Sequence, residues 1–229
     1  SFPSIIENGK NLEAVKVFED GKRMLDRIVE LDWLSINTVY GFFKARSNKE
    51  KVELIDHDLV FSFPRQLVDK SDHNLCLADF ISPRGDDYIG LFAVTSGYGL
   101  EKLVYKYEKD LDDYNSIMVK VIADRLAEAA TEWLHEKIRK EDWGYSASEN
   151  LHNDELIKEK YIGIRPAPGY ASCPDHSEKD KIWNLLDVKN NAGISLTESR
   201  AMNPASSVCG WYFSHPESRY FSVLKNYAV

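Results

Sequence analysis

The sequence has little cysteine and no long apolar run. Its cysteines, Cys76, Cys173 and Cys209, lie far apart and form no C-x-x-C pair, so neither a disulfide framework nor a structural zinc site is expected. No apolar stretch approaches the roughly 18 residues that a membrane helix requires. The start of the chain, SFPSIIENGK, carries no basic segment followed by an apolar one. We therefore expect no membrane contact and a reducing, cytoplasmic location.

An excess of basic residues is also missing. Asp and Glu number 37 against 29 Lys and Arg, which gives a formal net charge of −8. Because the phosphate backbone of nucleic acids attracts clustered cations, DNA or RNA binding is not expected. A short basic group at Lys137, Arg139 and Lys140 is interpreted as a solvated helix end, although local attraction of an acidic partner stays open.

The sequence lacks the short motifs of several enzyme classes. It has no G-x-S-x-G, P-loop or G-x-G-x-x-G segment, so hydrolase, NTPase and dinucleotide-binding functions are without support. Its histidines form no H-E-x-x-H pair. The acidic groups at 56–58 and 112–113 lack the glycine of a calcium loop and are interpreted as turns. No metal site is predicted.

Helix and strand patterns follow one another irregularly, which predicts an α+β domain rather than a βαβ fold. Apolar residues spaced by three and four predict a helix over 11–31 that packs on the core. Helices are also expected near 153–160 and from Ser177, where S-x-x-D resembles a capping box. A turn is expected at 215–218. Short β-rich runs predict strands over 37–43, 51–55, 59–63, 74–80, 88–95, 206–214 and 220–224.

The clearest helix is predicted over 118–140. On the side away from its apolar stripe, Asp124, Glu128 and Glu132 recur every four residues. Periodicity alone predicts that these carboxylates face solvent. The apolar face expected to pack on the rest of the domain consists of Met118, Ile122, Leu126, Ala129, Ala130 and Trp133.

The most unusual segment is RPAPGYASCPDH, which begins at Arg165. Pro166 and Pro168 fix their own φ and hold the residues before them extended. Since proline has no N–H, the segment is not expected to complete a sheet ladder. The N–H groups of Ala167 and Gly169 should then stay free for another partner, such as a ligand.

Two interpretations of this segment stay open. It is either a pre-organised ligand loop or a rigid surface turn whose arginine makes an ordinary ion pair. In the first, Arg165 offers a planar fork for a carboxylate or phosphate, Gly169 permits close approach and Tyr170 supplies an aromatic face. His176 is likewise either a proton carrier or an ordinary loop residue.

Longer blocks of sequence carry a resemblance. IGIRPAPGYASCPDHSEKDKIWNLLDV, LTESRAMNPASSVCGWYFSHPESRYFSV, KVIADRLAEAATEWLHEKIRKEDWGY and LCLADFISP cover most of residues 75–225, and FEDGKRMLDRI and NTVYGFFKA match more loosely. Together they resemble the C-terminal activation domain of cobalamin-dependent methionine synthase. The resemblance implies one domain over 1–229, C-shaped and α+β, with a twisted antiparallel sheet flanked by helices.

The resemblance also implies a function. In this family the domain binds S-adenosylmethionine and supports reductive methylation of inactive cob(II)alamin to methylcobalamin, with a flavodoxin-type electron donor. Cobalamin would be held by a separate domain of the same or another protein, because this chain has no D-x-H-x-x-G sequence. The chain is therefore expected to be catalytically incomplete alone.

Family roles in ligand binding transfer onto matching positions of the RPAPGY segment. Arg165 would pair with the methionyl carboxylate of S-adenosylmethionine. The backbone of Arg165, Ala167 and Tyr170 would bind the polar edges of the ligand, and Gly169 would allow its approach. Tyr170 would also face the cobalt of the docked cobalamin domain.

Further roles fall outside that loop. Tyr220 would contact the ligand, with Phe221 beside it. Asp124 would meet the displaced cobalt-ligating histidine of the cobalamin domain, Glu128 would lie near the sulfonium, and His176 would lie near the cobalamin face.

The chain departs from the family pattern at its ends. Family domains begin with an Asp-Trp segment whose aspartate contacts the ligand amine, whereas Asp32–Trp33 here precedes the first predicted strand. Both ends are therefore expected to be truncated, and ligand affinity to be reduced. An alternative stays open, in which the chain is an interaction module that docks a corrinoid domain or a flavodoxin without binding S-adenosylmethionine.

Overall fold

The computed structural model describes residues 11–67 and 74–223. Shorter helical segments are the 3-10 helix η1 (Leu77–Phe80) and the π-helical turn η2 (Ile138–Asp142). The α-helices are α2 (Leu12–Glu30), α3 (Leu100–Lys109), α4 (Asp113–Lys137), α5 (Asn153–Ile157), α6 (Glu178–Leu186) and α7 (Val188–Ala192). The strands are β1 (Ser35–Asn48), β2 (Lys51–Leu54), β3 (Val60–Ser62), β4 (Asp87–Tyr98), β5 (Ser195–Leu196), β6 (Met202–Asn203) and β7 (Ser207–Tyr212).

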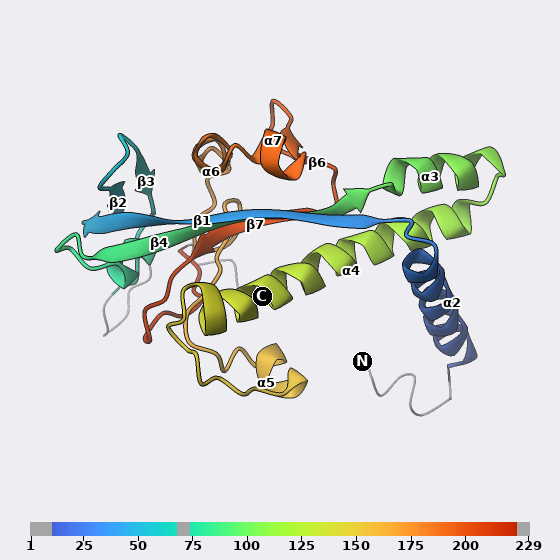
Figure 1. The fold of residues 1–229 in the computed structure, drawn as a ribbon, viewed down its shortest axis with the longest axis horizontal. Helices are drawn as coiled ribbons and strands as arrows, with labels where there is room; N and C mark the ends of the chain where they lie inside the picture. The colour runs from blue at the N-terminus through green and yellow to red at the C-terminus, as the bar shows by residue number, and fades with distance from the viewer. Residues whose placement is uncertain (1–10, 68–73, 224–229) are drawn as a thin grey trace.

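The centre of the fold is a five-stranded sheet with the order β3-β2-β1-β4-β7, in which every neighbouring pair is antiparallel. A separate small ladder joins β5 to β6. Figure 1 shows α4 crossing one side of the sheet, with α6 and α7 on the other. The sheet is therefore the middle layer of the domain.

Strand β4, which lies between β1 and β7, is buried on both faces, which explains its nearly continuous apolar sequence. Leu91 and Ala93 pack in the core on the side of α6 and α7. Phe92 and Val94 pack with Leu134 of α4 on the opposite side. The period-two alternation of side chains along a strand thus divides the core into two halves.

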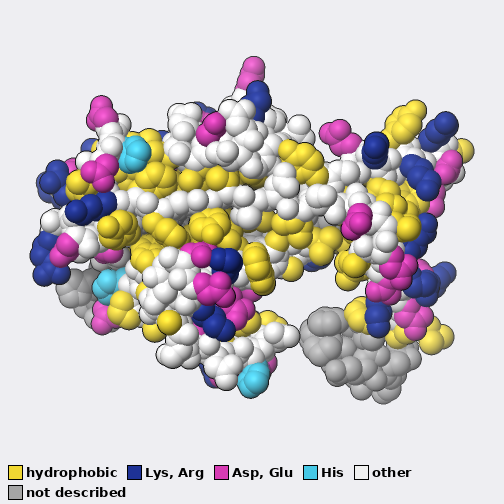
Figure 2. Space-filling model, in the orientation of Figure 1, with side chains coloured by type: hydrophobic (Ala, Val, Ile, Leu, Met, Phe, Trp, Pro, Cys, Tyr) yellow, Lys and Arg dark blue, Asp and Glu magenta, His cyan; other side chains and the backbone are white. Residues whose placement is uncertain are grey.

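The outline agrees with the expected C shape. Figure 1 shows α2 and α5 extending to the same side of the sheet, with α2 at one end of the long strands and α5 beneath their middle. Figure 2 shows lysine, arginine, aspartate and glutamate side chains mixed around α2, without a broad basic area on this face. The predicted α+β class with an antiparallel sheet flanked by helices is confirmed.

Helix α2 forms where it was predicted but packs differently. Met24 and Ile28 are buried against Leu103 of α3 and its surroundings. Leu12 and Val29, in contrast, are 79% and 67% exposed. The prediction that this helix is a core element is wrong for most of its apolar residues, because it contacts its neighbours through a narrow stripe only.

Of the early β-rich runs, 37–43, 51–55, 59–63 and 88–95 correspond to β1 to β4, and 74–80 is not a strand. The Asp79 carboxylate accepts the backbone N–H of Cys76 at 2.9 Å. This closes the turn of η1 and buries its apolar residues without extending the chain.

The C-terminal strand predictions are half right. The run 206–214 forms β7, and the turn at 215–218 is closed by a Ser218 N–H to His215 O hydrogen bond. Residues 220–223 are irregular, and Leu224 lies outside the described residues. Val223 bonds to the Ala171 carbonyl in a loop, so this segment has no neighbouring strand to pair with.

Two further helices begin close to their predicted positions. The helix near 153–160 is the short α5, and α6 begins at Glu178. The predicted Ser177 capping box does not form. Ser177 has the helical backbone angles φ −65° and ψ −22° in place of the extended ones typical of an N-cap, and its side chain makes no capping hydrogen bond. Its hydroxyl donates to Asp175 at 2.8 Å.

Helix α4 begins earlier than predicted and presents a different face to the sheet. The Asp112 carboxylate caps it by accepting the Asn115 N–H at 3.1 Å. Trp133, placed on the predicted face, is 61% exposed. Small residues at the contact let the helix approach the sheet closely, so the larger apolar residues flank the contact and do not centre it. The buried face consists of Ser116, Val119, Ala123, Ala127, Thr131, Leu134 and His135.

This assignment of the α4 face can be tested with two neighbouring residues. Leu134 is 1% exposed, so Leu134→Ala should lower the free energy of unfolding by about 2–5 kcal/mol through cavity formation. Trp133→Ala should change it by no more than about 0.5 kcal/mol, as expected for a surface position. Urea unfolding followed by circular dichroism measures both. A larger loss for Trp133→Ala would favour the face predicted from periodicity.

Candidate ligand-binding site

A cavity of about 320 Å³ lies between the loop that begins at Arg165, strand β7 and residues 220–221, and is called the 165–172 pocket here. Ala167, Tyr170, Tyr220 and Phe221 also line it, so most predicted ligand-binding residues meet around one space. A larger cavity of about 930 Å³ lies elsewhere, beside Arg65 and His215, and none of the predicted site residues lines it. The chemistry therefore favours the smaller cavity.

The loop is attached to the end of β7 despite its prolines. Ile164 and Phe213 exchange two backbone hydrogen bonds of 3.0 Å, and the Trp211 N–H donates to the Pro166 carbonyl at 3.0 Å. Proline lacks a donor but keeps its acceptor, so the segment extends the ladder for a short distance. The expectation that it forms no ladder is wrong at these positions.

Within the loop, one of the two N–H groups expected to be free is engaged. The Gly169 N–H donates to the Cys173 carbonyl at 2.8 Å, which closes the loop on itself. The Ala167 N–H has no acceptor among the residues that the structure describes. Ala167 therefore offers the pocket a backbone donor, whereas Gly169 does not.

Gly169 has a second, steric role. Its φ is +95°, and a Cβ at this position would lie 2.1 Å from Cε1 of His176. The imidazole of His176 thus packs against the glycine backbone. His176 is exposed and does not line the 165–172 pocket.

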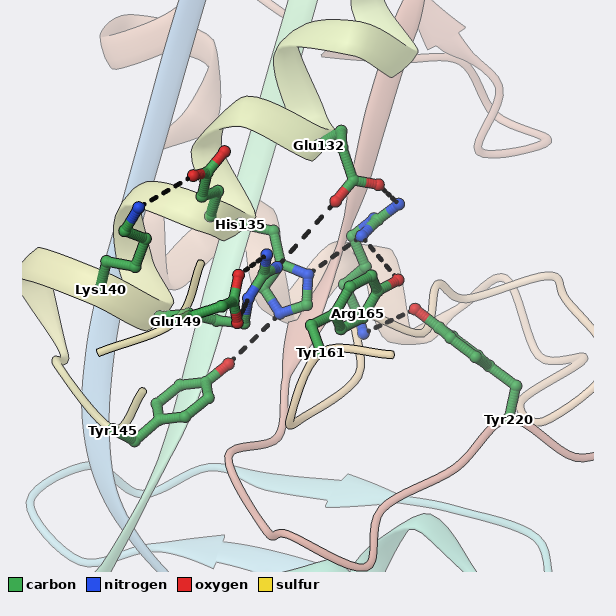
Figure 3. Close-up of polar contacts among 10 residues, drawn as sticks. Glu132, His135, Lys140, Tyr145, Glu149, Tyr161, Arg165 and Tyr220 are labelled. Atoms are coloured by element: carbon green, nitrogen blue, oxygen red, sulfur yellow. Dashed lines mark hydrogen bonds and ion pairs between the residues drawn. The ribbon is translucent and has the colours of Figure 1, made fainter. Parts of the chain in front are cut away.

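Arg165 directs its guanidinium into a polar network (Figure 3). Nη2 donates to Oε2 of Glu132 at 2.5 Å. Nη1 donates to the Tyr161 hydroxyl and contacts Nδ1 of His135, both at 3.0 Å. The backbone N–H of Arg165 donates to the Tyr220 hydroxyl at 3.0 Å, which fixes that ring beside the loop.

The guanidinium of Arg165 has hydrogen-bonding capacity that the described residues do not use. The group has five N–H donors, and those on Nη1 are both engaged while Nη2 uses one. The donors without a partner among the described residues are therefore the Nε–H and one Nη2–H. Nε and Nη2 share an edge of the guanidinium, and an arginine can bind a carboxylate with two parallel hydrogen bonds through such an edge.

The same geometry determines the tautomer of His135. Arginine can only donate, so Nδ1 of His135 accepts from Arg165 and its hydrogen lies on Nε2, which is 3.3 Å from the Tyr145 hydroxyl. Burial, and then the nearby guanidinium groups of Arg139 and Arg165, hold the pKa of His135 well below its ordinary value. The imidazole is therefore neutral.

Arg139 is a second buried cation in this network. It is 0% exposed, donates to Glu149 at 2.8 and 2.7 Å, and lies 4.3 Å over the Tyr161 ring. Its Nη1 and Oε1 of Glu132 are 4.0 Å apart, and each lacks a hydrogen-bond partner within the described residues. The interpretation of the basic group 137–140 as a solvated helix end is therefore wrong for Arg139.

The two lysines of that basic group behave as the interpretation expects. Lys137 and Lys140 form surface ion pairs with Asp142 and Glu136. Neither pair reaches the 165–172 pocket.

The acidic residues of α4 differ in their surroundings. Asp124 accepts a hydrogen bond of 2.7 Å from Ser206, whose neighbour Ser207 lines the pocket. Glu128 is exposed and paired with Arg125. The solvent-facing prediction is wrong for Glu132, which anchors Arg165. None of these carboxylates lines the pocket itself, but the stripe passes beside it.

Sequence reasoning missed several residues of the site. Glu132 was noticed only as part of a periodic stripe, and His135 and Tyr161 carried no signal beyond their side-chain types. Lys179 lines the pocket, is 6% exposed and donates to the Arg200 carbonyl at 3.0 Å. A buried lysine on an apolar helix face cannot be distinguished from a surface lysine by composition.

The cysteines are free and buried. Burial raises the pKa of Cys209, which lines the pocket, to about 12. A thiol with so high a pKa is a poor nucleophile. Among the residues described, no group of His, Cys, Asp and Glu could hold a metal ion, and no helix is both long and apolar enough to cross a membrane.

Comparison with known proteins defines the class first. A solved structure of the MetH reactivation domain bound to AdoHcy matches with a TM-score of 0.92 and 46% sequence identity, over 97% of this chain and 72% of that chain. The fold is thus that of a reactivation domain. The family "Vitamin B12 dependent methionine synthase, activation domain" matches residues 1–227. The chain belongs to this family, and the resemblance found in the sequence is confirmed.

The fit of Gly169 against His176 predicts a specific destabilisation. Gly169→Ala should lower the free energy of unfolding by about 1–3 kcal/mol, because the positive φ is strained for alanine and the added Cβ meets the imidazole. Gly144→Ala is the matched control, since its φ is +72° but an added Cβ would lie 3.6 Å from the Glu141 carbonyl oxygen, an ordinary van der Waals distance. Removing the ring in Gly169→Ala/His176→Ala should recover the steric part in urea unfolding. Equal losses for both glycines would contradict the contact.

The neutral state of His135 predicts a pH dependence of stability. Below about pH 6.5 the unfolded chain binds a proton on this residue that the native state does not bind. The free energy of unfolding therefore decreases as the pH is lowered, by up to about 1.4 kcal/mol per pH unit. Urea unfolding between about pH 8 and about pH 5.5 should therefore show a shallower slope for His135→Asn than for the wild type. His57→Asn, at an exposed position, is the control. An unchanged slope in His135→Asn would show that His135 is protonated in the native state.

Proposed function

We propose that this domain binds S-adenosylmethionine in the 165–172 pocket. It would thereby support reductive methylation of cob(II)alamin to methylcobalamin, with cobalamin held by a separate domain and the electron supplied by a cytoplasmic flavodoxin-type donor. The observation that carries the proposal is that Arg165, which lines this pocket, has unused donors on Nε and Nη2, which together would form a free edge for a carboxylate. The AdoHcy-bound relative supports the choice of ligand.

The two ends of the ligand have matching partners. The methionyl carboxylate would bind the free edge of Arg165. Two parallel hydrogen bonds to a guanidinium neutralise the carboxylate charge and also fix the orientation of the ligand. The Ala167 N–H would donate to a polar atom of the ligand. The adenosyl part would lie against Tyr170, Tyr220 and Phe221 in the remainder of the pocket.

The charge of the ligand also suits its surroundings. S-adenosylmethionine carries a sulfonium cation, and the acidic stripe of α4 passes beside the pocket. Glu128 would lie near the sulfonium, although its side chain is 56% exposed, which limits the attraction. The net charge of −8 adds a weak general attraction for a cation.

The chemistry balances with one external electron. Methyl transfer breaks the methyl carbon–sulfur bond and leaves its electron pair on sulfur, so S-adenosylhomocysteine is released. The new bond to cobalt needs two electrons, of which cob(II)alamin holds one and the flavodoxin-type donor supplies the other. S-adenosylhomocysteine is the same compound as the AdoHcy bound to the relative.

Exposed residues at the pocket and beyond it would serve docking. Tyr170 is 71% exposed and would face the cobalt of the docked cobalamin domain. Asp124 would receive the displaced cobalt-ligating histidine of that domain. His176, exposed beside Gly169, would lie near the cobalamin face.

Calorimetric titration of S-adenosylmethionine into the purified domain tests the proposal. The wild type should show saturable binding, and Arg165→Lys should weaken it by at least about tenfold, because lysine keeps the charge but loses the bidentate edge. Arg165→Ala should abolish it. Arg84→Ala, at an 80% exposed side chain far from the pocket lining, is the matched control.

Thermal unfolding of each variant identifies changes that act through stability. Undiminished binding by folded Arg165→Ala would refute the role of Arg165. No binding by the folded wild type would leave the chain as a docking module for a corrinoid domain or flavodoxin.

A further inference from the structure

We infer that His135 is a positioning residue that holds the Arg165 guanidinium in the orientation from which its free edge binds the ligand carboxylate. The inference rests on the proposed function and assigns to the site a residue that does not line the 165–172 pocket. It is carried by the arrangement of acceptors around Arg165 and by the confinement of the imidazole ring (Figure 3).

Three acceptors determine how the guanidinium lies. Glu132 accepts from Nη2, while His135 and the Tyr161 hydroxyl accept from Nη1. Without Nδ1 of His135, one Nη1 hydrogen would be buried and unpaired, and the group would gain by turning Nε or Nη2 inward. The edge left for the ligand would then be lost. His135 therefore affects ligand binding without touching the ligand.

The acceptor on His135 is itself held in place. The ring is 0% exposed and stacks on Tyr212, with centroids 5.1 Å apart and an interplanar angle of 22°. It lies nearly perpendicular to the ring of Tyr161, with centroids 5.1 Å apart and an interplanar angle of 79°. Its Nε2 is 3.3 Å from the Tyr145 hydroxyl. An imidazole that contacts two aromatic rings and is bonded at both nitrogens presents its Nδ1 lone pair in one direction.

A neutral acceptor suits this position better than a charged one. Arg165 already has one carboxylate partner in Glu132, so a second negative charge here would reduce its attraction for the ligand carboxylate. Arg139 and Glu149 form their own pair on the other side of His135, and Tyr145, Tyr161 and Tyr212 complete the titratable surroundings. Neutral histidine supplies the hydrogen bond and leaves the charge of Arg165 for the ligand.

The test compares two ligands that differ at the carboxylate. S-adenosylhomocysteine contains the amino acid end, and 5′-methylthioadenosine lacks it. His135→Leu should weaken S-adenosylhomocysteine binding by about tenfold, the size expected for one hydrogen bond to a charged group, and should leave 5′-methylthioadenosine binding unchanged. His135→Asn, whose Oδ1 lies near the position of Nδ1, should restore most of the affinity. His57→Leu, at an exposed histidine, is the control.

A double-mutant cycle separates positioning from general damage. In an Arg165→Lys background, which weakens binding without abolishing it and has no guanidinium to orient, His135→Leu should have no further effect on S-adenosylhomocysteine binding. Equal weakening of both ligands, or no weakening of either, would overturn the inference. Failure of the wild type to bind either ligand would overturn the proposed function, and this inference with it.

If His135→Leu does not fold, the tautomer provides the second test. Nitrogen-15 NMR of the wild-type domain should show His135 neutral with its hydrogen on Nε2, and its signal should move when S-adenosylhomocysteine binds. A hydrogen on Nδ1 would overturn the inference, since Nδ1 could not then accept from Arg165.

Discussion

The need to pair two buried guanidinium groups determines how the second half of the chain is arranged. Arg139 is fully buried and the Arg165 side chain is 21% exposed. A buried charge without a partner costs several kcal/mol, so carboxylates from separate segments must reach both. Glu132 comes from α4 and Glu149 from the chain beyond it. The loop that carries Arg165 is therefore drawn onto α4, and the pocket forms beside it.

The end of α4 is shaped by the same requirement. Helix α4 passes into the π-helical turn η2, and the Ser146 N–H then bonds back to the Arg139 carbonyl at 2.8 Å. This return brings Glu149 onto the Arg139 side chain. A π-turn widens the helix by one residue, and such turns occur frequently at functional sites. Backbone geometry and charge pairing thus support each other at this corner.

The sequence carried the fold class, the central helix, the longer strands and, through its blocks of resemblance, the family. It also identified the loop at Arg165 and several of the residues that line the pocket. Hydrophobic periodicity predicted the wrong buried face of α4, because tertiary contacts determine that face. Small residues such as Ala123 and Ala127 form the centre of its contact with the sheet. Charge patterning placed Glu132 and Arg139 in solvent, because partners distant in the sequence cannot be seen in a local pattern.

The Glu132 carboxylate lies between the guanidinium groups of Arg165 and Arg139. Its Oε2 is bonded to Arg165, while its Oε1 faces Nη1 of Arg139 across 4.0 Å, with both atoms unpaired among the described residues. Arg139 already pairs with Glu149, so a rotation of the Glu132 carboxylate toward Arg139 would leave Arg165 without a carboxylate partner unless another anion took its place. Two guanidinium groups thus lie within reach of one shared carboxylate, and the charge balance of this corner depends on which of them it faces.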